Sequence, residues 1–239
     1  MIKAILFDLD GTLLPMDQDK FTAKYFDALA RHHAKYGYDP KKLVDAVWKG
    51  TVAMLKNDGS ATNEQAFWTT FEQVTGESAK SALPKFDEFY ASGFDDVKSV
   101  CGFEPKSAQV IAAAKTVGVP LVLASNPIFP VEAQIKRAEW AGANVSDFSY
   151  ITSYGNSRYC KPNPMYYQEI ADSLGCKPDE CLMIGNDTSD DLAASKIGMR
   201  VFIITDCLIN KKGVDITELL HGNVDRLIEY LMLQGFKRQ

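Results

Sequence analysis

Two aspartates, Asp8 and Asp10, follow the first predicted strand and are the first residues that suggest chemistry. Residues 2–7 are apolar, β-branched or aromatic apart from one lysine, which is typical of a buried central strand. If the strand continues, both carboxylates point to the same side, because side chains alternate between the two faces. Two like charges at a buried strand tip are costly unless a cation lies between them. A hard divalent cation with oxygen ligands is the usual solution.

Polar residues also follow two later strands. Ser125 and Asn126 end one apolar run, and the run 181–184 leads into the acidic segment 185–191, Gly-Asn-Asp-Thr-Ser-Asp-Asp. Between them, Lys161 stands shortly before a predicted helix. Gathered at one sheet edge, these residues would supply carboxylates, a hydroxyl, a lysine and backbone amides. That combination suits a phosphoryl group bound together with magnesium.

The elements that must position these residues alternate between short apolar strands and helices. Such alternation predicts an α/β fold, a Rossmann-like parallel sheet with helices on both faces, whose ligands bind beyond the carboxyl ends of the strands. The expected strands after the first are 119–125, 150–152, 181–184 and 201–204, and the expected helices are 106–117, 131–141, 165–174, 192–197 and 224–233.

Residues 19–90 have helical periodicity almost throughout. Asp39-Pro40 is a helix start, Thr62 with Gln65 matches a capping box, and Gly76 is a helix end. No strand pattern interrupts this stretch. The sequence therefore predicts an all-helical insert over residues 16–99, with the α/β core formed by residues 1–15 and 100–239.

Composition narrows the class of protein. The net charge of −5 has acidic and basic residues interspersed, which argues against nucleic acid or an anionic membrane as the main partner. No apolar run approaches the roughly 20 residues that span a bilayer. The start has no signal-peptide pattern, and the five cysteines are odd in number without a CxxC pair, so we expect a cytoplasmic protein.

The four polar segments, in their order and at their strand ends, resemble the four motifs of the haloacid dehalogenase (HAD) superfamily. The resemblance covers roughly residues 1–15 and 100–220, and the helical insert resembles the C1-type cap of the phosphoglycolate phosphatase and β-phosphoglucomutase group. It implies that Asp8 is a nucleophile that forms an aspartyl-phosphate, and that Asp10 is the general acid and then the general base.

The same resemblance implies the remaining roles. Thr12 and Ser125, with Asn126 beside it, would bind the phosphoryl oxygens, and Lys161 would neutralise the phosphate and steady Asp8. Mg²⁺ would be held by the Asp8 side chain, the Asp10 backbone carbonyl and an acidic residue of the last motif.

The last motif departs from the family pattern, because Asn186 stands where an aspartate is commonest. Two registers are possible, Asp187 with Asp191 or Asn186 with Asp190. A metal site of this kind needs a carboxylate, so we favour Asp187 as ligand and Asp191 as its acidic partner, with Asp190 in reserve.

The predicted function is a Mg²⁺-dependent phosphatase of a small phosphorylated metabolite, acting as a monomer or weak homodimer. An aspartate at position 10 argues against a dehalogenase, which lacks one there in this family. A sugar phosphomutase would keep every motif, and a non-catalytic phosphate binder is a further alternative.

The sequence of the insert does not identify a substrate. Its lysines could face the substrate or the solvent, and its aromatic residues have the spacing of core positions. These aromatic residues are Phe21, Tyr25, Phe26, Trp48, Phe67, Trp68, Phe71, Phe86, Phe89 and Tyr90, and the lysines are Lys20, Lys24, Lys49 and Lys56.

Overall fold

Six parallel strands form one sheet in the order β3-β2-β1-β4-β5-β6. The computed structural model describes residues 1–236. The strands are β1 (Ala4–Phe7), β2 (Leu121–Leu123), β3 (Tyr150–Ile151), β4 (Cys181–Gly185), β5 (Arg200–Ile204) and β6 (Leu220–Gly222). Phe7 at the end of β1 stands opposite Leu123 of β2 and Ile184 of β4. The carboxyl ends of these three strands therefore meet, and the strand order reverses at β1, where such sheets bind ligands.

Both faces of the sheet are covered. Alternating strand residues such as Ile5 and Leu6 belong to two different buried clusters, one on each face. The first cluster includes residues of α5 (Ser107–Lys115), α6 (Val131–Trp140) and α8 (Val224–Phe236), and the second includes residues of α7 (Pro164–Ser173) and the 3₁₀ helix η5 (Asp191–Ile197). The predicted Rossmann-like parallel sheet with helices on both faces is confirmed.

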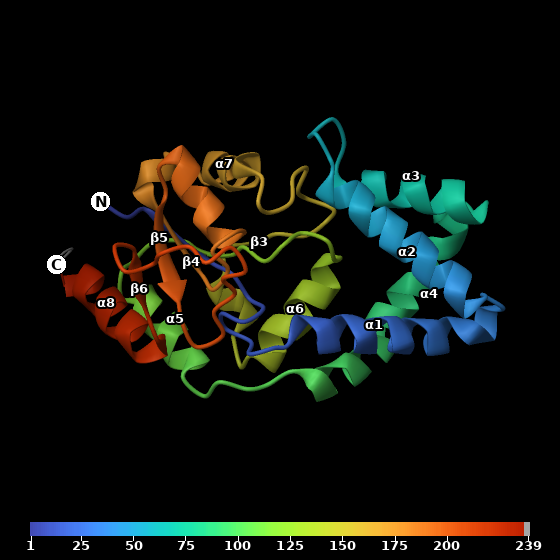
Figure 1. Ribbon diagram of the computed structural model, residues 1–239, viewed down its shortest axis with the longest axis horizontal. Coiled ribbons are helices and arrows are strands. Elements are labelled where there is room, and N and C mark those ends of the chain that lie inside the picture. Colours follow the sequence, from blue (N-terminus) through green and yellow to red (C-terminus); the bar gives the residue numbers. More distant parts are fainter. Residues whose placement is uncertain (237–239) are drawn as a thin grey trace.

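The stretch between β1 and α5 is helical, as the periodicity predicts. Its elements are α1 (Gln18–His33), η1 (Ala34–Tyr36), α2 (Pro40–Leu55), α3 (Asn63–Thr75), α4 (Ala79–Ala91) and η2 (Gly93–Val100), with α1 to α4 lying to one side of the sheet (Figure 1). Asp39 caps α2 ahead of Pro40, and Thr62 and Gln65 form the predicted capping box. Gly76 ends α3 with φ +74°, a conformation that favours glycine.

The chain enters and leaves this helical stretch at one place. Met16 pairs with Cys101 in an isolated antiparallel bridge, and the Gly102 N–H donates to the Pro15 carbonyl at 2.7 Å. The two connections therefore run side by side.

Several elements differ from the sequence-based expectation. Residues 191–197 form a 3₁₀ helix, and the strand β6 and the 3₁₀ helices η2, η3 (Val145–Asp147) and η4 (Pro178–Glu180) were not predicted. The sequence of β6, Leu-His-Gly, is too short and polar for a strand signal, and β6 is held by pairing with β5 at the sheet edge. Across residues 1–236, no helix combines the length and apolar character that crossing a membrane requires.

Candidate active site

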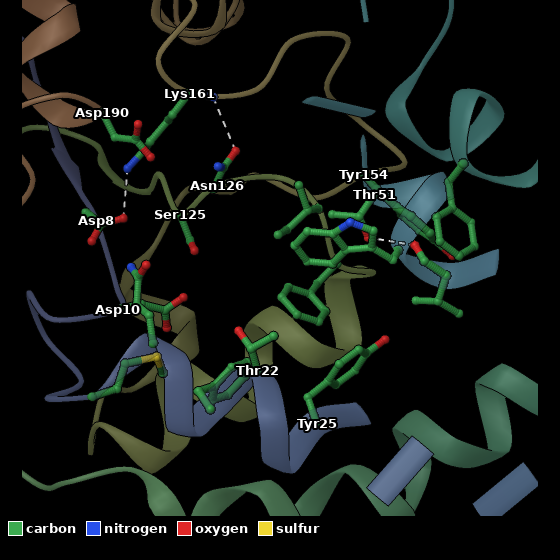
Figure 2. Close-up of a pocket in the computed structure, with 18 of the residues that line it drawn as sticks. Asp8, Asp10, Thr22, Tyr25, Thr51, Ser125, Asn126, Tyr154, Lys161 and Asp190 are labelled. Carbon is green, nitrogen blue, oxygen red and sulfur yellow. Dashed lines mark hydrogen bonds and ion pairs between the residues drawn. The ribbon is translucent and has the colours of Figure 1, made fainter. Parts of the chain in front are cut away.

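A buried lysine joins two carboxylates at the carboxyl end of β1. Lys161 Nζ lies 2.8 Å from Asp8 Oδ1 (Figure 2). It also lies 2.7 Å from Asp191 Oδ1. Burial alone would lower the pKa of Lys161, but the charges of Asp191 and Asp8 outweigh it and raise that pKa well above its usual value. The lysine therefore stays cationic beside Asp8.

Gly185 makes room for Asp191. A Cβ at position 185 would lie 2.1 Å from the Asp191 carboxyl carbon, so no larger residue fits at the end of β4 while Asp191 keeps its place. Asp191 is 1% exposed, and its second oxygen accepts the Asp187 N–H at 2.9 Å. Both carboxylate oxygens of Asp191 are thus engaged by protein donors.

Asp187 lies in the loop that follows β4. Its Oδ1 accepts the N–H groups of Ser189 at 2.6 Å and Asp190 at 3.0 Å. Within residues 1–236 its other oxygen accepts no hydrogen bond and is available to a ligand. Asp190 lies near Lys161, and burial raises its pKa (Figure 2).

Asn186 connects the last motif to the first. Its side-chain amide donates to the Cys207 carbonyl at 2.7 Å, and its Oδ1 lies 3.2 Å from the Thr12 hydroxyl. Thr12 Oγ1 also lies 3.0 Å from Asp8 Oδ2. Gly11 has φ +87°, and a Cβ there would lie 2.2 Å from the Asn186 amide nitrogen, so only glycine fits this close approach.

Arg137 is a site residue that the sequence reasoning missed. It projects from α6, is 1% exposed, and its Nη1 donates to Asp10 Oδ2 while its Nη2 donates to Gln134. The guanidinium also lies 4.7 Å from the ring centre of Phe129. A signal existed in the sequence, because Arg137 falls on the face of α6 that carries Ala133, and a buried charge needs a partner.

Burial raises the pKa of Asp10, with Arg137 opposing this shift and Asp8 adding to it. Desolvation is the largest cause of the raised pKa. Asp10 Oδ1 is buried and has no hydrogen-bond partner among the described residues. A proton on this carboxyl would therefore be available to a molecule bound beside it.

Ser125 and Asn126 follow β2 and line the same pocket as Asp8 (Figure 2). The Ser125 carbonyl accepts the Tyr166 hydroxyl at 2.9 Å and the Thr152 hydroxyl at 2.8 Å. Asn126 Oδ1 accepts the Lys161 N–H at 3.2 Å. All the predicted site residues except Thr12 therefore line one pocket. Thr12 contacts Asp8 but is not part of the pocket wall.

The pocket has a volume of about 210 Å³ and extends from these carboxylates into the helical stretch. The carboxylates lie at one end, Thr51 and Tyr154 lie at the other, and Thr22 and Tyr25 lie along the wall between them (Figure 2). Its wall includes aromatic residues that the sequence analysis interpreted as mostly core. Those that line it are Phe21, Tyr25, Phe26, Trp48, Phe67, Trp68, Phe86 and Tyr90.

Comparison with known proteins identifies the family. The model of haloacid dehalogenase-like hydrolases matches residues 2–198, and the chain belongs to this family of hydrolytic enzymes. It is 28% identical over 206 residues to the protein named "Putative phosphatase YhcW" of Bacillus subtilis (strain 168), across 85% of this chain and 84% of that one. It is 25% identical over 206 residues to a phosphoglycolate phosphatase of Vibrio vulnificus (strain YJ016), across the same shares of the two chains.

A solved structure supports the fold. The 2-haloacid dehalogenase from Pseudomonas syringae pv. Tomato DC3000 matches 97% of this chain and 98% of its own, with a TM-score of 0.60 and 20% identity. At this identity the likeness concerns the fold alone. The reaction is determined by the residues of the site.

Proposed function

We propose that the protein is a phosphatase that hydrolyses the phosphomonoester of a small metabolite through an aspartyl-phosphate on Asp8. The observation that carries the proposal is the buried Lys161 held between Asp8 and Asp191, in a pocket that Asp10 also lines. A carboxylate steadied by a fixed cation and facing a second carboxyl group is an arrangement for nucleophilic and acid–base chemistry.

In the first step, an Asp8 oxygen attacks phosphorus while the bond from phosphorus to the leaving oxygen breaks. Protonated Asp10 gives its proton to that oxygen. In the second step, water attacks the phosphorus of the aspartyl-phosphate, Asp10 accepts a water proton, and phosphate and free Asp8 are released. Burial of Asp10 supports this role, since a raised pKa brings acid and base forms closer to working pH.

The donor set fits Mg²⁺. Residues 1–236 hold no group of three or more histidine, cysteine or acidic side chains arranged for a metal ion. Mg²⁺, however, is commonly bound through one or two carboxylates together with waters and substrate phosphate oxygens. Asp8, the Asp10 carbonyl and the available oxygen of Asp187 would hold it here, and the ion would neutralise charge on the phosphoryl oxygens.

Asp191 has a different part in this proposal from the one expected from the sequence. Its oxygens are engaged by Lys161 and the Asp187 N–H, so we assign Asp191 to positioning Lys161. Asp187 remains the proposed acidic ligand.

Residues 16–99 are the proposed cap. Residues of this helical stretch and residues that follow the carboxyl ends of the strands together form the pocket wall. The two connections between them meet at Met16 and Cys101. Closure of the helices over the sheet would keep bulk water away from the aspartyl-phosphate before the hydrolytic step.

Hydrolysis of a generic aryl phosphate with and without Mg²⁺ tests the proposal. We expect turnover with Mg²⁺, its loss in excess chelator, and its loss in Asp8→Asn. Glu139→Gln on the exposed side of α6 is the matched carboxylate control and should keep full activity. Undiminished hydrolysis by Asp8→Asn or in chelator would contradict the proposal.

A further inference from the structure

The two ends of the pocket differ sharply in charge. The lining residues near Lys161 carry carboxylate, amide or hydroxyl groups. The lining residues from the helical stretch are mostly aromatic. Apart from Lys161, the lining residues include no lysine, arginine or histidine. The polar side chains that the helical stretch and Tyr154 contribute to the pocket wall are neutral, namely those of Gln18, Thr22, Tyr25, Thr51, Tyr90 and Tyr154.

The tyrosine hydroxyls at the aromatic end remain uncharged. The hydroxyl oxygens of Tyr25 and Tyr90 are 2.9 Å apart and share a hydrogen bond. Burial raises the pKa of Tyr25 to about 12. This end of the pocket therefore offers hydrogen bonds and ring surfaces, and no full charge.

The lysines of the helical stretch do not line the pocket. Lys49 pairs with Asp45 at 2.7 Å on α2, and Lys85 pairs with Glu77 at 2.6 Å. The Lys20 side chain is 73% exposed. The Arg137 guanidinium lies against the Phe129 ring, but it is not among the lining residues and is paired with Asp10. A second anionic group on the substrate would consequently be buried against aromatic rings without a cation in the pocket wall to meet it, which is strongly unfavourable.

The volume of the pocket limits the size of the alcohol that leaves the phosphate. Apolar cavities of about 150 Å³ accommodate a benzene-sized molecule, and this pocket measures about 210 Å³. A phosphoryl group at Asp8 leaves room for a group about the size of one ring against Phe67, Trp68 and their neighbours.

We propose that the natural substrate carries a single phosphate on an uncharged, predominantly apolar alcohol about one ring in size. This inference rests on the proposed phosphatase function. It disfavours a leaving group with its own carboxylate, such as glycolate, and a sugar bisphosphate of the kind that a phosphomutase must hold.

A matched pair of esters tests this preference. Benzyl phosphate and 4-carboxybenzyl phosphate have the same ring and an alcohol of similar leaving ability, and differ by one carboxylate. We expect kcat/KM with Mg²⁺ to be at least tenfold higher for benzyl phosphate, mainly through KM, and phosphoglycolate to be a poor substrate. Equal or reversed kcat/KM values would overturn the inference and leave the phosphatase proposal standing.

A positive charge introduced at the aromatic end of the pocket provides a second test of the inference. Thr51→Lys adds a cation at a lining position on α2. It should lower the ratio of kcat/KM for benzyl phosphate to kcat/KM for 4-carboxybenzyl phosphate at least threefold. Thr69→Lys on the exposed face of α3 adds the same charge outside the pocket and should leave the ratio unchanged. An unchanged ratio in folded Thr51→Lys would contradict the inference, and hydrolysis of no ester at all would overturn both proposals.

Discussion

Arg137 of α6 pairs with Asp10 of the first motif from inside the protein, across 127 positions of sequence. The arginine is almost fully buried, and Gln134 and the Phe129 ring hold it in place. One oxygen of Asp10 is thereby fixed, while the other is left without a described partner. The pair thus orients the carboxyl group that we propose as acid and base.

We predict that Arg137→Met lowers kcat at least tenfold and moves the pH profile of kcat to higher pH. The arginine charge opposes the raised pKa of Asp10, so its removal raises that pKa further and frees the side chain. Arg137→Lys should restore part of the activity because it keeps the charge. Loss of stability with an unmoved pH profile would assign Arg137 a packing role only.

Substitutions of Asp187 and Asp191 in the last motif should differ in how they change the Mg²⁺ dependence of activity. Asp187→Asn is expected to raise the Mg²⁺ concentration for half-maximal activity at least tenfold, because it weakens the proposed acidic ligand. Asp191→Asn should lower kcat and change that Mg²⁺ concentration less than threefold, because it removes a partner of Lys161. Titration of activity with Mg²⁺ measures both, and the reverse result would show that the proposed assignment is wrong.

Gly185→Ala should destabilise the protein and lower activity. The added Cβ overlaps the Asp191 carboxylate, which is held in a packed site, and such overpacking costs about 1–3 kcal/mol. Gly155→Ala is the control, since its Cβ would lie 3.3 Å from the end of the Glu64 side chain, which can move. Urea unfolding should show a loss for Gly185→Ala alone. Equal stability of the two variants would contradict the tight fit at Gly185.

Buried His33 should make stability depend on pH. Burial lowers its pKa from 6.5 to about 4, and the nearby His32, Lys85 and Lys35 add to this shift, while its Nδ1–H donates to the Leu29 carbonyl at 2.9 Å and opposes it. Between these two values the unfolded chain binds more protons than the folded one, so stability falls as pH falls from about 6.5 toward 4. The loss from this residue is on the order of 2 kcal/mol.

His33→Phe should flatten that pH dependence, because the ring packs 4.6 Å from Phe86 and its replacement does not titrate. Unfolding by urea at pH 7 and pH 4.5 measures the difference. His221→Phe, at a half-exposed position on β6, should retain the wild-type slope. The same slope in His33→Phe as in the wild type would rule out His33 as its source.

The sequence predicted those parts of the site that adjoin strand ends. Asp8, Ser125 and the segment 185–191 each follow an apolar run, and parallel strands bring such positions together without further information. Arg137 was missed because its partner is set by how α6 packs over the sheet, which periodicity does not encode. The departure at Asn186 was visible in the sequence, but its amide contacts to Thr12 and Cys207 depend on two loops meeting.

The aromatic residues of the insert show another limit of pattern reading. Helical spacing identifies a buried face, and Phe71 is fully buried as that spacing predicts. It cannot distinguish a face that packs on protein from one that packs on a substrate, because both are apolar. Phe67 and Trp68 are largely buried and nevertheless line the pocket.

The bridge between Met16 and Cys101 makes the helical stretch a loop with its two ends at one place. In terms of protein engineering, it is a cassette with two adjacent splice points. Exchanging residues 17–100 for the corresponding insert of a relative would leave β1, β2 and β4 paired as they are. On the proposed function, we expect such a chimera to keep the phosphatase activity and to change its preference for the alcohol toward that of the donor.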